Sequence, residues 1–368
     1  MQNSELGINM KNEINQIKEA LTNTISNFIN SSANSLPKDI YDFKNICIIA
    51  CGTSYHSGLI GKKILEKNLN IPCEVILANE FELSSNVHNK NTLFIFISQS
   101  GKTTDVLNVL NLIQPFNPAT LAITNSPGST LQSLCNYSII LCAGEEKAIA
   151  STKAFNCQIL AFLMLAYTYI FSTNALFKKL DKLIAKINKI DFEKFNSDKI
   201  KKLSEHLKDQ HVVYFIGKGY DHTFAKESAL KLKETCYIHT ISLPTLEMLH
   251  GTMAVFNEND FVVAIVTQPT EIEQTNQVLK AIKESGAKVA IISTYSKKLF
   301  KSHFDLFIPI PKVADELSLV LNIIPSQWLA YHTSISLGNN PDSPRRLVKA
   351  VIWLKQGKAP TLYNTITL

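Results

Sequence analysis

Residues 92–103 read TLFIFISQSGKT, an apolar run followed directly by a polar turn. Its first half, Thr92 to Ile97, is a short continuous apolar run, which is typical of a strand buried on both faces of a parallel sheet. Its second half is a turn of small and hydroxyl-bearing residues, and the apolar spacing from Thr104 to Ile113 predicts a helix directly after that turn. The stretch therefore predicts a strand, a polar turn and a helix, in that order.

The same order of elements occurs earlier in the chain. Asn45 to Ala50 is another apolar run, followed by Cys-Gly-Thr-Ser at 51–54 and then by helical spacing from Leu59 to Leu69. Further strands are expected at Leu121 to Thr124 and at Ser138 to Leu141. Short buried strands that alternate with helices indicate an α/β fold with a parallel, doubly wound sheet.

The pattern returns in the second half of the chain, where a helix is expected at Phe224 to Glu234. The expected strands are His211 to Ile216, Phe261 to Thr267, Val289 to Ser293 and Leu306 to Pro309. Corresponding strands of the two halves are offset by about 165 to 170 residues, which indicates an internal duplication of one α/β unit. One continuous large sheet is the alternative.

Four segments follow from this pattern. They are an N-terminal helical segment (1–40), a first α/β domain (41–175), a second α/β domain (200–340) and a C-terminal tail (341–368). A single amphipathic helix is expected over residues 10–29, because the apolar side chains recur there in steps of three and four. The lysine-rich stretch from Lys178 to Lys202 connects the domains, and its Leu and Ile spacing favours helix.

Composition restricts the class of protein. The chain has 368 residues, of which 45% are hydrophobic and 18% charged, as in a globular protein of two ordinary domains. The net charge of +6 is spread over scattered lysines, which argues against a nucleic-acid partner. Seven cysteines without any CxxC pair argue against a disulfide framework or a zinc site, so no metal is expected.

The location of the protein is inferred from the same features. Buried cysteines within apolar runs indicate a reducing compartment. The N-terminus has no apolar segment typical of a secretion signal. The most apolar window, Ile159 to Phe171, is shorter than the roughly 20 residues of a membrane span and is expected to be a buried helix. We therefore expect a cytoplasmic protein without a membrane partner.

Ligands of open parallel sheets bind beyond the carboxyl ends of the strands, which singles out the turns at 51–54 and 98–103. Both turns are rich in hydroxyl groups and open a helix, so their backbone N–H groups and hydroxyls form a neutral cradle for a phosphate. Each turn alone is also a common helix cap. Residues 150–154, Ala-Ser-Thr-Lys-Ala, form a third wall or another cap. Because neither turn matches GxGxxG or GxxxxGK[ST], no nucleotide cofactor is expected.

Charged residues in the second half give weaker signals. Glu227, Lys231 and Glu234 share one helix face, where the pattern alone favours a solvated stripe of ion pairs. The alternative is a carboxylate and an ammonium that a pocket holds together. His250 lies in an expected loop, where surface histidines are commoner than catalytic ones, and Lys349 is by composition one lysine among many. The residues by themselves indicate a binding fold for a small phosphorylated metabolite.

Six strings of the sequence resemble a known family. In chain order they are CGTSYHSG, SQSGKT, ASTKAF, ESALKLKETCYIH, HGTMAVF and PRRLVKA. They resemble the sugar isomerase (SIS) domain family and, within it, the isomerase portion of the glutamine–fructose-6-phosphate amidotransferases. The resemblance implies two tandem SIS domains, each a five-stranded parallel sheet flanked by helices, and agrees with the duplication inferred above.

The resemblance also implies how a sugar phosphate is bound. By motif position, the phosphate is held in the first domain by the turn residues Ser98, Gln99, Ser100 and Thr103. The sugar site is lined by Thr53 and Ser151, with Ser54 beside them. The implied substrate is a hexose 6-phosphate or an amino-hexose 6-phosphate, and no cofactor is implied.

Catalytic roles follow from the same resemblance. Glu234 resembles the base that moves a proton between carbons 1 and 2, and Lys231 and Glu227 occupy the supporting positions on its helix. Lys349 resembles the lysine that forms a Schiff base with the open-chain ketose. His250 resembles the histidine that assists ring opening from the partner subunit, which implies a homodimer with shared active sites.

The chain departs from the amidotransferase pattern at several points. No glutaminase domain and no Met-Cys start precede the SIS portion, so glutamine hydrolysis is not expected. Lys102 stands where the family has glutamate in SQSGET, which changes the charge of the pocket or of its rim. HGTM replaces HGPL, and residues Val351 to Leu368 extend beyond the usual end.

These observations lead to an expected function with three alternatives. We expect an aldose–ketose isomerase of an amino sugar phosphate: a glucosamine-6-phosphate deaminase–isomerase, or an ammonia-dependent synthase with fructose 6-phosphate as the ketose. The first alternative is a deglycase of 6-phosphorylated fructosamines. The others are a non-catalytic sugar-phosphate-binding regulator and an isomerase fragment of a full amidotransferase.

Overall fold

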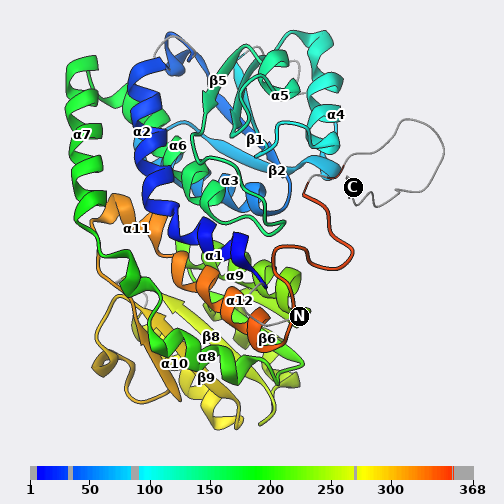
Figure 1. Cartoon of the computed structure of the whole chain (residues 1–368), viewed down its shortest axis with the longest axis vertical. Helices are drawn as coiled ribbons and strands as arrows, with labels where there is room; N and C mark the ends of the chain where they lie inside the picture. The colour runs from blue at the N-terminus through cyan, green and yellow to red at the C-terminus, as the bar shows by residue number, and fades with distance from the viewer. Residues whose placement is uncertain (1–5, 32–35, 84–90, 269–271, 350, 352–368) are drawn as a thin grey trace, which may run out of the picture. The chain divides into compact units, whose positions relative to one another are not determined.

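The computed structural model describes residues 6–31, 36–83, 91–268, 272–349 and Val351, and the chain folds into two compact units (Figure 1). The first unit consists of Gln16–Ile190 together with Arg345–Leu368. The second unit consists of Met1–Asn15 together with Asp191–Pro344. Each unit therefore includes residues that are distant in sequence from its sheet, such as residues 8–15 in the second unit and residues 345–349 in the first.

A five-stranded parallel sheet of order β2-β1-β3-β4-β5 forms the centre of the first unit. Its strands are β1 (Asn45–Ala50), β2 (Cys73–Leu77), β3 (Thr92–Ile97), β4 (Ala119–Thr124) and β5 (Tyr137–Ile140). Its helices are α2 (Ile17–Ser31), α3 (Gly52–Leu69), α4 (Thr104–Ile113), α5 (Thr130–Leu134), α6 (Lys153–Ile170) and α7 (Thr173–Lys189). Short 3₁₀ turns lie at Ile40–Asp42, Ala78–Glu80 and Gln114–Phe116.

Helices cover both faces of this sheet. Side chains of alternate strand positions, such as Phe94 and Phe96, pack against the apolar side of α4 and against Leu131 of α5. On the other side, α3 packs against β1, β2 and α6. A Cβ atom at Gly61 would come within 2.5 Å of the ring of Phe162, so glycine permits the close approach of α3 and α6.

The second unit repeats this topology, because its sheet order β7-β6-β8-β9-β10 is also parallel throughout. Its strands are β6 (Val212–Gly217), β7 (His239–Pro244), β8 (Phe261–Val266), β9 (Lys288–Ser293) and β10 (Leu306–Pro309). Its helices are α1 (Ile8–Asn15), α8 (Asp198–Leu207), α9 (Tyr220–Cys236), α10 (Ile272–Glu284), α11 (Asp315–Leu321) and α12 (Ile324–Ser336). Short 3₁₀ turns lie at Phe192–Phe195, Thr245–Leu249, Thr252–Val255 and Lys297–Phe300.

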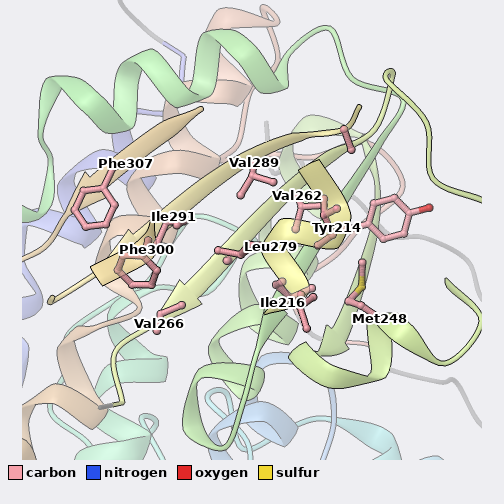
Figure 2. Packing of buried hydrophobic residues seen from close by; sticks show 14 residues of the cluster. Tyr214, Ile216, Met248, Val262, Val266, Leu279, Val289, Ile291, Phe300 and Phe307 are labelled. Atoms are coloured by element: carbon pink, nitrogen blue, oxygen red, sulfur yellow. The ribbon is translucent and has the colours of Figure 1, made fainter. Parts of the chain in front are cut away.

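Figure 2 shows the core on one face of the second sheet, where Ile216, Val262 and Ile291 of three neighbouring strands point toward Leu279 of α10. Phe300 and Phe307 lie at one end of this cluster, and Tyr214 and Met248 lie at the other. The opposite side is covered by α9, which packs against β6 and β7, and by α8 and α12. Strands buried on both faces explain the continuous apolar runs in the sequence.

The two five-stranded sheets confirm the expected duplication and exclude one large sheet. The strands read from apolar runs are all present, within two residues of their expected bounds. The edge strands β2 and β7 were not predicted, because several of their side chains are partly exposed and no continuous apolar run marks them. The connection between domains is helical, as expected, with α7 and α8 on either side of a 3₁₀ turn.

The expectation of one leading helix over residues 10–29 is wrong. The helix is interrupted at Gln16, so that α1 belongs to the second unit and α2 to the first. In the second unit, α1 is fixed by Asp342, whose carboxylate accepts hydrogen bonds from the backbone of Asn9 and Met10. The four-segment division of the chain stays a prediction.

Helix α6 contains the most apolar part of the chain. Among the described residues it is the one helix long and apolar enough to cross a membrane, yet 83% of that window is buried within the protein. This burial confirms the prediction of a core helix. All seven cysteines lie in described residues and are free, and burial raises the pKa of the Cys47, Cys157 and Cys236 thiols to about 12.

Candidate functional site

The turn after β3 folds around its own hydroxyl groups. Ser98 is buried, and its Oγ lies 2.9 Å from Oγ1 of Thr103 and accepts a hydrogen bond of 3.1 Å from the backbone N–H of Gly101. Oγ of Ser100 accepts from the backbone N–H of Lys102, whose side chain is exposed. This arrangement places Ser98, Ser100 and Thr103 within one tight turn at the N-terminus of α4. We call this turn, residues 98–103, the hydroxyl cradle.

Neighbouring loops hold the hydroxyl cradle in place. The carbonyl oxygen of Gln99 accepts hydrogen bonds from the backbone of Asn125 and from the hydroxyls of Thr124 and Ser126. Gly101 has φ +62°, and a Cβ atom there would come within 2.2 Å of Oγ of Ser129. Glycine is therefore required at this position by both backbone conformation and space.

The turn after β1 lies at the same end of the sheet, because β1 and β3 are hydrogen-bonded neighbours. Thr53 and Ser54 are in the first turn of α3 and are partly exposed. Oγ of Ser54 accepts a hydrogen bond of 2.9 Å from Nε2 of Gln158 on α6. The two hydroxyl-rich turns thus occur on adjacent strands, as the sequence predicts.

A buried carboxylate, Glu146, lies in the loop between β5 and α6. It accepts hydrogen bonds from Oγ of Ser151 (2.8 Å) and from the backbone N–H groups of Thr152 (2.9 Å) and Ala154 (3.2 Å). These donors stand at the N-terminus of α6, which favours negative charge. The Ser151 hydroxyl is therefore engaged with Glu146 in this structure.

Lys349 completes this cluster from the C-terminal end of the chain. Its Nζ lies 2.9 Å from Oε2 of Glu146 and donates to the carbonyl oxygen of Ala148 at 2.5 Å. The Lys349 side chain is 28% exposed, whereas that of Glu146 is fully buried. Two residues later, the carbonyl oxygen of Val351 accepts a hydrogen bond of 3.2 Å from the backbone N–H of Thr104, the first residue of α4. The segment that carries Lys349 is thus attached next to the hydroxyl cradle.

Opposing effects set the pKa of the Glu146 carboxyl. Burial alone would raise the pKa, because it disfavours the charged form. The charge of Lys349 and the hydrogen bonds from Lys349, Thr152 and Ser151 act in the opposite direction and outweigh burial. The pKa of Glu146 therefore lies below its ordinary value, and the residue is ionised at neutral pH.

In the second unit, α9 carries a row of three charges. Nζ of Lys231 lies 3.5 Å from Oε1 of Glu227 and 2.5 Å from Oε2 of Glu234. The side chains of Lys231 and Glu227 are only 1% exposed, and that of Glu234 is 22% exposed. The solvated stripe that the pattern favoured is therefore wrong, because the face is buried. Glu234 forms the accessible end of a buried ionic row.

His250 follows the 3₁₀ turn Thr245–Leu249 and is exposed, as are its neighbours Leu249 and Val255.

The carboxyl end of the sheet in the second unit differs from that in the first. There the buried carboxyl group of Asp221 accepts hydrogen bonds from the backbone N–H and the hydroxyl of Thr267 at the end of β8. A carboxyl group from the start of α9 is thus bound to the residue that follows β8, the strand that corresponds to β3 of the first unit.

The residues predicted for the site divide between the two units. The first unit holds the cradle residues, Thr53, Ser54, Ser151 and Lys349. The second unit holds Glu227, Lys231, Glu234 and His250. Sequence reasoning missed Glu146, which lies 203 positions from Lys349 and carries no local signal of its role. Within the described ranges, no group of three His, Cys, Asp or Glu side chains is arranged to hold a metal ion.

The family model described as "SIS domain" matches residues 39–168 and 206–337. The chain is 34% identical over 346 residues to the glutamine–fructose-6-phosphate aminotransferase of Caldanaerobacter subterraneus, covering 91% of this chain and 56% of that protein. The chain spans about half the length of the curated relatives it matches.

Two solved structures are similar along nearly their whole length. The C-terminal domain of glucosamine–fructose-6-phosphate aminotransferase from Francisella tularensis is 30% identical, with a TM-score of 0.80, and the match covers 91% of this chain and 98% of that one. Glucosamine-6-phosphate deaminase from Thermotoga maritima is 25% identical, with a TM-score of 0.74, over 94% of this chain and 100% of that one.

Proposed function

This chain belongs to the SIS domain family, and we propose that it interconverts the aldose and ketose forms of a hexose 6-phosphate that carries an amino group at carbon 2. The proposed reaction is that of a glucosamine-6-phosphate deaminase–isomerase, or its reverse with ammonia and fructose 6-phosphate. The names of the relatives support the substrate class, since they include an aminotransferase acting on fructose 6-phosphate and a glucosamine-6-phosphate deaminase.

One observation carries the proposal: the first unit combines the hydroxyl cradle with the amine of Lys349. The Val351–Thr104 hydrogen bond attaches the lysine segment to the helix that the cradle opens. Lys349 is two residues before Val351, and consecutive Cα atoms are about 3.8 Å apart. The backbone of Lys349 therefore lies close to the start of α4, which directly follows the hydroxyl cradle. If the hydroxyls and backbone amides of the cradle bind the phosphate, the carbonyl group of the open-chain ketose remains available to react with the amine of Lys349.

Charge favours the first unit over the second as the phosphate site. The hydroxyl cradle is lined by neutral donors, with the exposed Lys102 at its rim. At the end of β8 in the second unit, the Asp221 carboxyl group accepts hydrogen bonds from the backbone N–H and the hydroxyl of Thr267. These donors are therefore occupied, and the negative charge of Asp221 would repel a phosphate.

Glu234 is the base in this proposal. It moves a proton between carbons 1 and 2, because its carboxylate is accessible and fixed by Lys231. His250 assists ring opening in the site of a partner subunit, and the exposed apolar neighbours Leu249 and Val255 suit a homodimer contact. A cytoplasmic location also remains a prediction.

Reductive trapping tests the proposed function. Incubation with fructose 6-phosphate and sodium borohydride is expected to add one reduced hexose phosphate per chain, located on Lys349 by peptide mass spectrometry. The reduced adduct is stable, because borohydride converts the imine into a secondary amine. An adduct that persists in Lys349→Ala, or that lies on other lysines of the wild-type chain, would disprove the assigned role of this amine.

A further inference from the structure

Glu146 is an acid with its own preformed site. Three donors of the chain, Oγ of Ser151 and the backbone N–H groups of Thr152 and Ala154, hold the carboxylate independently of Lys349. Two of them belong to the start of the 18-residue helix α6, whose N-terminus stabilises negative charge. The carboxylate therefore keeps several partners when the ammonium of Lys349 moves away.

Lys349 is bound less completely than its partner. Its Nζ makes one hydrogen bond to Glu146 and one to the carbonyl of Ala148, and part of its side chain is open to solvent. Its segment has no regular secondary structure. The amine can thus turn toward a ligand at the open side while the carboxylate stays fixed.

We propose that Glu146 is the positioning residue and proton acceptor of Lys349. It holds the ammonium in place before substrate arrives, takes its proton when the amine attacks, and then serves as the counter-ion of the iminium. This inference rests on the proposed function, because it assigns a partner to the amine that reacts with the ketose.

The step balances without any further reagent. The Lys349 ammonium gives one proton to Glu146, and the neutral amine attacks the carbonyl carbon, forming a C–N bond. The proton on Glu146 and one more from the nitrogen then leave with the former carbonyl oxygen as water. The ammonium and the iminium each carry one positive charge, so Glu146 is ionised at the start and at the end.

The pH dependence of trapping tests this role. In the wild-type chain the proton passes within the pair, so the rate of borohydride trapping with fructose 6-phosphate is expected to vary little between pH 6 and 8. In Glu146→Gln the proton must go to solvent. The rate is then expected to be about 100-fold lower at pH 7 and to rise about tenfold per pH unit, as the neutral fraction of the amine does.

Two further variants separate this role from a structural one. Glu146→Asp keeps the carboxylate and is expected to keep the flat pH profile at a reduced rate. Glu145→Gln, at the exposed neighbouring glutamate that pairs with Lys147 at 3.6 Å, is expected to match the wild type. A flat profile and an unchanged rate in Glu146→Gln would overturn the proposal.

Acetylation with acetic anhydride tests the pair without any sugar, so its result is independent of the proposed function. The Lys349 amine of the wild-type chain is expected to react faster at pH 7 than that of the exposed Lys147, because Glu146 takes the proton of the attacking amine. In Glu146→Gln the rate of Lys349 acetylation is expected to fall about 100-fold. Equal rates for Lys349 in the wild type and in Glu146→Gln would show that the carboxylate does not take the proton of the amine.

Discussion

Replacing Glu234 by glutamine is expected to lower kcat for the aldose–ketose interconversion by about 10²- to 10⁴-fold, the usual contribution of a positioned general base. Glutamine has the shape of glutamate but cannot accept the proton. The affinity for the sugar phosphate is expected to change little, because the proposed phosphate contacts come from the first unit. Steady-state kinetics and titration calorimetry measure the two effects separately.

The matched control for Glu234→Gln is Glu284→Gln, which removes an exposed carboxylate of α10 in the same unit. It is expected to leave kcat unchanged. If Glu234→Gln kept more than a tenth of the wild-type kcat, another group would have to be the base. A binding protein without catalysis would show sugar-phosphate affinity but no turnover in the wild type.

Replacing Lys231 by methionine is expected to lower the free energy of unfolding by about 3–5 kcal/mol. The reason is that Glu227 and Glu234 would keep their negative charges on a buried helix face after losing the ammonium between them. Methionine nearly fills the volume of the lysine stem, so the loss measures charge rather than a cavity. Urea denaturation of the wild type and the variant gives the difference.

Two comparisons make this prediction specific. Lys280→Met removes the exposed partner of Glu284 on α10, where the ion pair is worth less than about 1 kcal/mol. The double variant Glu227→Gln/Lys231→Met is expected to recover part of the lost stability, because one buried charge disappears with the ammonium. A loss below about 1 kcal/mol for Lys231→Met would contradict a buried ionic row.

The fold could be predicted well wherever side chains are buried on both faces of a sheet. Thr92–Ile97 and Asn45–Ala50 are continuous apolar runs, and the observed strands have the expected bounds. The edge strands β2 and β7 lack this signal, because neighbours cover them less. The interruption of the helix at Gln16 could not be predicted from the sequence either, because the apolar spacing continues from α1 into α2. The two helices nevertheless belong to different units.

The sequence predicted only part of the candidate site. Hydroxyls that follow neighbouring strands could be grouped, because parallel strands end at one edge of a sheet. Burial of Lys231 could not be read from helical spacing, since it depends on which elements cover that face of α9. The pairing of Glu146 with Lys349 joins residues 203 positions apart and leaves no periodic trace in the sequence.

Release of ammonia from glucosamine 6-phosphate by the purified chain tests the proposed reaction itself. We expect ammonia and fructose 6-phosphate in equal amounts, with turnover abolished in Lys349→Ala. The same assay on 6-phosphorylated fructosamines serves as the comparison. Turnover of those compounds alone, or of neither class while the chain is folded, would contradict the proposed reaction.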